Sequence, residues 1–167
     1  LSRELGTGPA RVYSSPPLAS WPRTAALLNG AVSHSIEMDD IYSPALYHPG
    51  CPTIAAALAV AEATGASGRD LLRAIAIGYD VGNRIGRAIQ PSHYRYWHTT
   101  GTVGGVGAAA AAAVLLRLDA RQTAHALATV ATFAAGLQQA FRSDAMSKPL
   151  HAGRAAEAGV LAAEGAQ

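Results

Sequence analysis

Apolar residues recur at helical spacing along most of the chain, and short stretches with proline, glycine or charged residues separate them. Leu71, Ile75 and Tyr79 lie four residues apart and therefore share one face of a helix. Ser67 and Asp70 precede them with the spacing of a capping box, which favours a helix start at this point. No stretch alternates apolar and polar residues for long enough to predict a strand. The pattern therefore predicts an all-α fold.

Capping residues and prolines predict the bounds of the other helices. One helix begins at Ser20 and Pro22, and another begins at Asp119, which Gln122 complements as a reciprocal cap. The predicted helices cover residues 22–35, 52–65, 67 onward, 103–118, 119–141 and 149 onward. Residues 1–20 hold several glycines and prolines with little periodicity, and they predict an extended connector. The sequence thus predicts a connector over 1–20 and a helical bundle over 21–167.

Small residues dominate the centre of the chain. Residues 108–113 are six consecutive alanines, and Gly101, Gly104, Gly105 and Gly107 precede them. Helices with alanine and glycine faces can approach closely, because no large side chain holds the backbones apart. We therefore expect tightly crossed helices.

Composition and charge narrow the classes of partner. The chain has 167 residues, 50% of them hydrophobic and 14% charged, which is typical of one packed domain. Its net charge of +2 forms no basic stripe, so we expect neither nucleic acid nor a membrane as the partner. A single cysteine, Cys51, and no signal peptide favour a cytoplasmic protein. The chain begins at Leu1 rather than methionine, so we expect it to be part of a longer protein.

Titratable residues gather in three loops that the helices separate, and four of the six histidines lie in these loops or just beyond them. The residues are Glu37, Asp39, Asp40 and His48 in the first loop, His93, Trp97 and His98 in the second, and Arg142, Asp144, Lys148 and His151 around the third. Such clustering is a stronger indication of a site than any single residue in it.

Lys148 and His98 carry the sharpest indications of chemistry. Lys148 is the only lysine among 13 lysine and arginine residues, and a lysine can release a proton that an arginine keeps. His98 precedes Thr100 and a glycine-rich helix start, where backbone N–H groups favour anions. The alternatives are compositional drift for the lysine and stacking on Trp97 for the histidine. We interpret His34 and His125, which fall within helices, as structural.

No motif for a metal or nucleotide is present. The sequence has no His-x-x-x-His pair, P-loop, dinucleotide fingerprint or Gly-x-Ser-x-Gly elbow, so we expect neither a metal site nor a cofactor. Acids, histidines and one lysine suit proton transfer next to a carboxylate, which requires a base, an acid and cations for the developing charge. The residues therefore favour cofactor-free chemistry on an anionic substrate.

Three ordered motifs resemble those of the MmgE/PrpD family, which includes 2-methylcitrate dehydratase, cis-aconitate decarboxylase and iminodisuccinate epimerase. The matching stretches are LLNG and SHSIEMDD within residues 27–40, HPG at 48–50, WHTTGT at 97–102, and MSKPLHAG with two alanines within 146–156. The family often has aspartate at the position of Glu37 and threonine at the position of Ile41. Its members are more than twice as long, and the resemblance implies a mixed α/β lid domain after this helical one.

The resemblance also implies site residues and an activity. The resemblance implies catalytic roles for four residues, Glu37, His48, His98 and Lys148. We expect four others to bind substrate, namely Asp39, Asp40, Thr100 and His151. The expected reaction is dehydration of a 2-methylcitrate-like hydroxy acid in propionate metabolism, by a cofactor-free homodimer. Decarboxylation of cis-aconitate and epimerisation of iminodisuccinate are alternatives within the family. A non-catalytic self-association domain and a carboxylate-binding module are alternatives of other classes.

Overall fold

Helices account for most of the computed structural model, which describes residues 5–143 and 145–167. The α-helices are α1 (Pro22–Ser33), α2 (Gly50–Thr64), α3 (Gly68–Ala88), α4 (Thr99–Thr102), α5 (Gly104–Leu115), α6 (Ala120–Thr132) and α7 (Lys148–Glu164). Short 3₁₀ turns, η2 (Ser43–Ala45), η3 (His93–Arg95) and η4 (Gln138–Phe141), lie in the loops between them. The prediction of a helical bundle is confirmed, with one small hairpin added to it.

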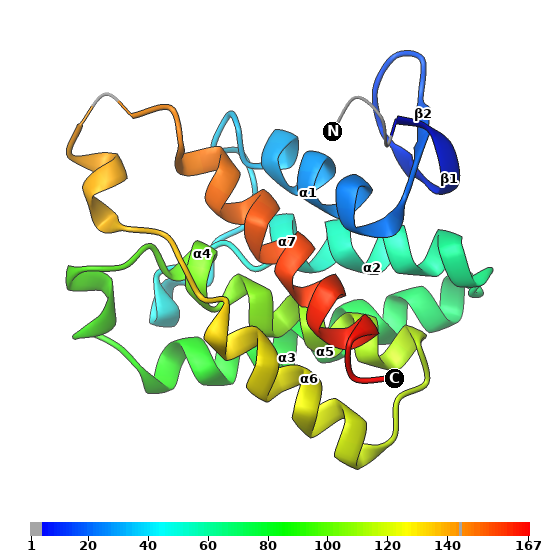
Figure 1. Ribbon diagram of the computed structural model, residues 1–167. Helices are drawn as coiled ribbons and strands as arrows, with labels where there is room; N and C mark the ends of the chain where they lie inside the picture. The colour runs from blue at the N-terminus through cyan, green and yellow to red at the C-terminus, as the bar shows by residue number, and fades with distance from the viewer. Residues whose placement is uncertain (1–4, 144) are drawn as a thin grey trace.

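Helix α5 forms the centre of the bundle. It packs against α2, α3, α6 and α7, and its alanines from Ala108 to Ala113 are all buried. Helix α7 crosses α5 and also lies along α1, as Figure 1 shows. The loops that lead into α2, α4 and α7 carry the titratable residues of the sequence motifs. The core therefore serves as a frame for these three loops.

Glycines permit the closest crossings between helices. A Cβ atom at Gly153 of α7 would collide with the carbonyl oxygen of Leu27 in α1. At the crossing of α3 and α5, a Cβ atom at Gly78 would lie 2.7 Å from the carbonyl oxygen of Gly107. In both places the added Cβ atom would lie closer to a carbonyl oxygen than van der Waals contact allows. The observed spacing of the helices therefore requires glycine at these two positions. The expectation of tightly crossed helices is confirmed.

The sixth helix starts as predicted but ends nine residues early. Asp119 and Gln122 form the reciprocal capping box, yet α6 stops at Thr132 rather than Phe141. Gly136 has a φ of 121°, and its carbonyl oxygen accepts a hydrogen bond of 2.9 Å from the His98 N–H. The segment after α6 thus turns back to pair with the loop before α4. This long-range pairing explains why the local pattern predicted too long a helix.

The interpretation of residues 1–20 as an extended connector is wrong for the part that the structure describes. Strands β1 (Leu5–Val12) and β2 (Leu18–Ser20) pair as an antiparallel hairpin, while residues 1–4 lie outside the described residues. Asn29 of α1 accepts from the Tyr13 N–H and donates to the Arg11 carbonyl oxygen. Glu62 of α2 binds the Arg11 side chain. These contacts with helices hold a hairpin that glycine and proline would weaken in isolation.

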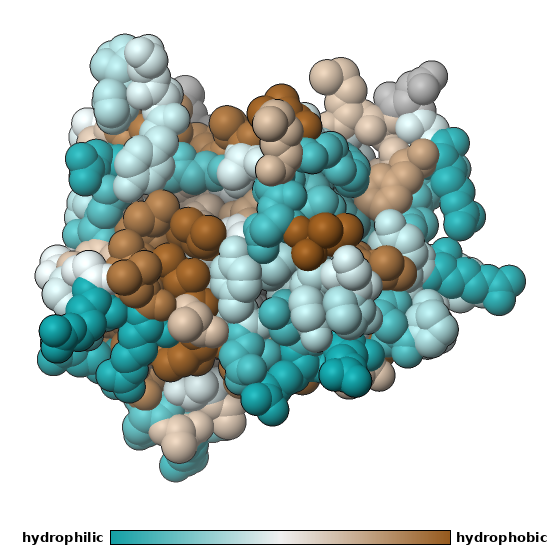
Figure 2. Space-filling view, turned by 180° about the vertical axis from the view of Figure 1, so that it is seen from behind, coloured by the Kyte–Doolittle hydropathy of each residue, from teal (hydrophilic) through white to brown (hydrophobic). Residues whose placement is uncertain are grey.

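None of the helices in the described part of the chain is long and apolar enough to cross a membrane. On the face opposite to the view of Figure 1, apolar side chains gather in several patches with hydrophilic residues between them (Figure 2). Exposed apolar side chains of the domain include Val32, Ile36, Met38 and Ile41, around the end of α1 and the loop that follows it. This part of the surface borders the loop that carries Glu37 and Asp39.

Candidate active site

Four parts of the chain bring titratable side chains together at one end of the bundle. His34 is the C-terminal cap of α1, and His48 lies just before α2. His98 is the N-terminal cap of α4, while Lys148 and His151 lie in the first turn of α7. The end of one helix and the starts of three others therefore supply the candidate site.

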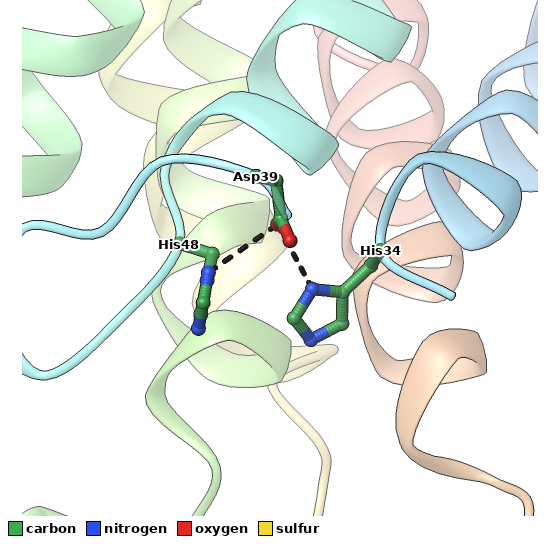
Figure 3. Close-up of side chains that lie close together, drawn as sticks. All are labelled: His34, Asp39 and His48. Atoms are coloured by element: carbon green, nitrogen blue, oxygen red, sulfur yellow. Dashed lines mark hydrogen bonds and ion pairs between the residues drawn. The ribbon is translucent and has the colours of Figure 1, made fainter. Parts of the chain in front are cut away.

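Asp39 lies between two imidazoles. Its Oδ2 atom is 2.9 Å from His34 Nδ1 and 3.4 Å from His48 Nδ1, and Figure 3 shows the carboxylate directed toward both rings. Burial alone would raise the pKa of Asp39, but hydrogen bonds, first the one from His34, outweigh it, so the pKa lies below its ordinary value. Asp39 is therefore ionised at neutral pH and acts as a hydrogen-bond acceptor.

A group of imidazole rings lines the inner part of the site. The His34 ring lies 4.7 Å from the His48 ring and 5.7 Å from the His98 ring, measured between centroids. His98 Nδ1 lies 3.0 Å from His151 Nδ1, so one of these nitrogens donates a proton and the other accepts it. Burial, with the nearby His151, lowers the pKa of His98 to about 2. Burial also lowers the pKa of His151, and both rings are neutral at physiological pH.

Glu37 and Lys148 form the outer part of the site. The Lys148 ammonium donates a hydrogen bond to the Glu37 carboxylate and lies 4.8 Å from the centre of the Phe141 ring. The same Phe141 ring contacts His98 edge-on, with centroids 4.6 Å apart. Glu37 has a φ of 55°, a conformation that side chains other than glycine rarely adopt and that is common at functional sites. The carboxylate is thus held in place next to the only lysine.

Two of the predicted substrate-binding residues use polar atoms to fix the loops. The Thr100 hydroxyl accepts a hydrogen bond of 3.1 Å from the His48 N–H. Asp40 Oδ1 accepts a hydrogen bond of 3.1 Å from the Gly50 N–H, at the start of α2. Thr100 is completely buried. In this structure these two residues position His48 and α2, and their binding of substrate stays a prediction.

A cation could be accommodated at His34, Asp39 and His48, where one ligand atom from each residue lies within 4.8 Å of the others. Because Asp39 is ionised, the contact of 2.9 Å with His34 is a hydrogen bond in which Nδ1 carries the proton. A metal ion would have to displace that proton. The three residues therefore fit a hydrogen-bonded cluster better than a metal centre.

The order and identity of these residues agree with a known family. Residues 1–167 match the model of the MmgE/PrpD N-terminal domain. The chain belongs to this family. The resemblance seen in the three motifs is thereby confirmed, and so is the fold class that it implied.

Relatives of this MmgE/PrpD domain include named decarboxylases. The human cis-aconitate decarboxylase is 35% identical over 158 residues, which cover 91% of this chain and 32% of the relative. A cis-aconitate decarboxylase-like protein of Aspergillus oryzae is 33% identical over 140 residues, covering 78% and 29%. The cis-aconitate decarboxylase of Aspergillus terreus is 32% identical over 147 residues, covering 84% and 30%. The chain thus spans about a third of the length of these relatives.

The MmgE/PrpD domain brings together the four predicted catalytic residues, Glu37, His48, His98 and Lys148. His34, which its position within a helix predicted to be structural, is part of the same cluster. The position of His34 shortly before Glu37 and Asp39 was a signal in the sequence that it belongs to the site. Its place within a predicted helix led instead to its assignment to the core. Of the other loop residues, His93 forms a hydrogen bond of 2.8 Å with Thr102, and Asp144 lies outside the described residues.

Proposed function

We propose that this domain is the helical part of a cofactor-independent lyase that removes carbon dioxide from a tricarboxylate of the cis-aconitate type. The cluster of Glu37, His48, His98 and Lys148 is the observation that carries the proposal. It combines a cation, a carboxylate and imidazoles at one end of the helical bundle. The names of the relatives support decarboxylation ahead of the dehydration that the motifs alone led us to expect.

Decarboxylation makes two demands on the protein. The bond between carbon and a carboxylate breaks, carbon dioxide leaves, and the electron pair moves through the neighbouring double bond to a carbon beside another carboxylate. That carbon must then receive a proton, so an acid is needed there. The charge that develops on the remaining carboxylates must be stabilised by cations or N–H donors.

The described side chains fit these demands by position. Lys148 and His48 are the candidate proton donors, because their side chains are 28% and 16% exposed and can meet a substrate. His98 is 2% exposed and neutral. A neutral imidazole suits a hydrogen bond to a substrate rather than the role of a positively charged proton donor. Glu37 accepts a hydrogen bond from the Lys148 ammonium and holds it in place.

The test uses the full-length protein with cis-aconitate, 2-methylcitrate, citrate and iminodisuccinate, followed by proton NMR in deuterated buffer. We expect loss of carbon dioxide from cis-aconitate with one deuterium in the product. Replacement of His98 by asparagine is expected to abolish turnover, while replacement of the exposed His125 in α6 is expected to retain it. Loss of water from 2-methylcitrate without decarboxylation would restore the dehydratase assignment. A folded protein that changes none of the four compounds would refute the proposal.

A further inference from the structure

His34 lies next to Asp39, Glu37, His48 and His98 although it is completely buried. Its Nδ1 atom binds Asp39, and its Nε2 atom lies 3.7 Å from Glu37 Oε1. Its ring lies against the rings of His48 and His98. A side chain with no exposed surface is not a first choice for contact with substrate. Its contacts instead indicate that it acts through the groups around it.

The hydrogen bond to Asp39 determines which nitrogen of His34 carries a proton. Asp39 is an acceptor, so the proton lies on His34 Nδ1 and the Nε2 atom is left facing Glu37. In the described part of the chain, His34 Nε2 is buried without a hydrogen-bond partner. Among the described residues, the hydrogen bond to Asp39 is therefore the one that orients the His34 ring.

Asp39 has the same relation to His48. The His48 Nδ1 atom is also buried without a hydrogen-bond partner among the described residues, and it lies 3.4 Å from Asp39 Oδ2. A movement of a few tenths of an ångström would make this a hydrogen bond of ordinary length. Figure 3 shows His48 on one side of the Asp39 oxygen and His34 on the other. One carboxylate oxygen thus faces a nitrogen of each ring.

We propose that Asp39 and His34 form a positioning pair, in which Asp39 holds a proton on Nδ1 of both His34 and His48, so that Nε2 of His48 is the nitrogen that exchanges a proton with the substrate. His34 completes the pair by donating to Asp39 and by packing against the His48 ring. The inference rests on the proposed function for its catalytic consequence. Its structural part, the tautomer of the two rings, stands independently of the reaction.

Kinetics of the full-length protein test the catalytic part. Asp39→Asn keeps the size of the side chain and removes its charge, and the matched control is Asp80→Asn on the exposed face of α3. For Asp39→Asn we expect kcat to fall about 10- to 100-fold, with KM changed by less than about threefold. His34→Gln should lower kcat similarly, and the double variant should lose no more than the worse single variant.

Two results would overturn the proposal. The first is a loss of activity in Asp39→Asn that is fully matched by a lower melting temperature and a smaller folded fraction, which would show that Asp39 is needed only for folding. The second comes from ¹H–¹⁵N NMR of the histidine rings in the wild-type protein, where we expect the proton of His34 and His48 on Nδ1. Protonation on Nε2 instead would refute the pair. Because this measurement needs no substrate, it separates a failure of the pair from a failure of the proposed function.

Discussion

Acid should destabilise the domain through His98, a histidine that is 2% exposed and whose pKa in the folded state is about 2. An unfolded chain takes up a proton at histidine below about pH 6.5, whereas folded His98 stays neutral. The unfolded state then binds more protons, so the free energy of unfolding is constant above this pH and falls below it. Each pH unit corresponds to about 1.4 kcal/mol, so the loss from His98 at pH 5 is about 2 kcal/mol.

Urea unfolding followed by circular dichroism measures this loss. The free energy of unfolding is determined at pH 7 and at pH 5 for the wild type and for His98→Asn, which cannot titrate. We expect the wild type to lose about 2 kcal/mol more than the variant between the two pH values. The comparison uses the difference between pH values, so an effect of the substitution on packing cancels.

The exposed histidine His125 of α6 provides the matched control. His125→Asn is expected to lose as much stability as the wild type between pH 7 and pH 5. If the wild type and His98→Asn lose the same free energy, the buried histidine does not oppose protonation and the reasoning is refuted. An equal loss in His125→Asn and His98→Asn would lead to the same conclusion.

Three further predictions concern the lysine, the helix crossings and metal ions. Lys148→Arg should lower kcat of the full-length protein about 100-fold or more, because a guanidinium does not release its proton; near-normal turnover would exclude proton transfer by the lysine. Gly153→Ala should reduce the free energy of unfolding by about 1–3 kcal/mol by forcing α1 and α7 apart, whereas Gly68→Ala, which meets open space, should be neutral or stabilising in the same urea titration. Dialysis against EDTA should leave turnover unchanged, and activity that returns only with an added metal ion would contradict this.

Local signals predicted the starts of helices well. Ser67 accepts a hydrogen bond from the Asp70 N–H, and Asp119 forms its capping box with Gln122, both as the spacing predicted. Such caps depend only on residues within one turn, so the sequence contains all the information. The end of α6 and the hairpin depend on partners far along the chain, such as His98 for Gly136 and Glu62 for Arg11. No local pattern reports these contacts.

The site shows the same division between local and distant information. Glu37, His48, His98 and Lys148 could be selected because they belong to polar loops and to motifs of a family. His34 could not, because its helical position resembles that of a core residue until Asp39 and His98 are placed beside it. Likewise, the hydrogen bonds of Asp40 and Thr100 to backbone N–H groups depend on how the loops fold back. Residue types indicate chemistry, but the division of roles requires distances.

The close contact between α1 and α7 at Gly153 affects the distance between the two parts of the site that these helices carry. Main chains, rather than large side chains, set the distance between these helices at Gly153. His34 is attached to one of them and Lys148 to the other. A larger residue at the crossing would therefore pull the two halves of the site apart, so selection for chemistry also acts on the core.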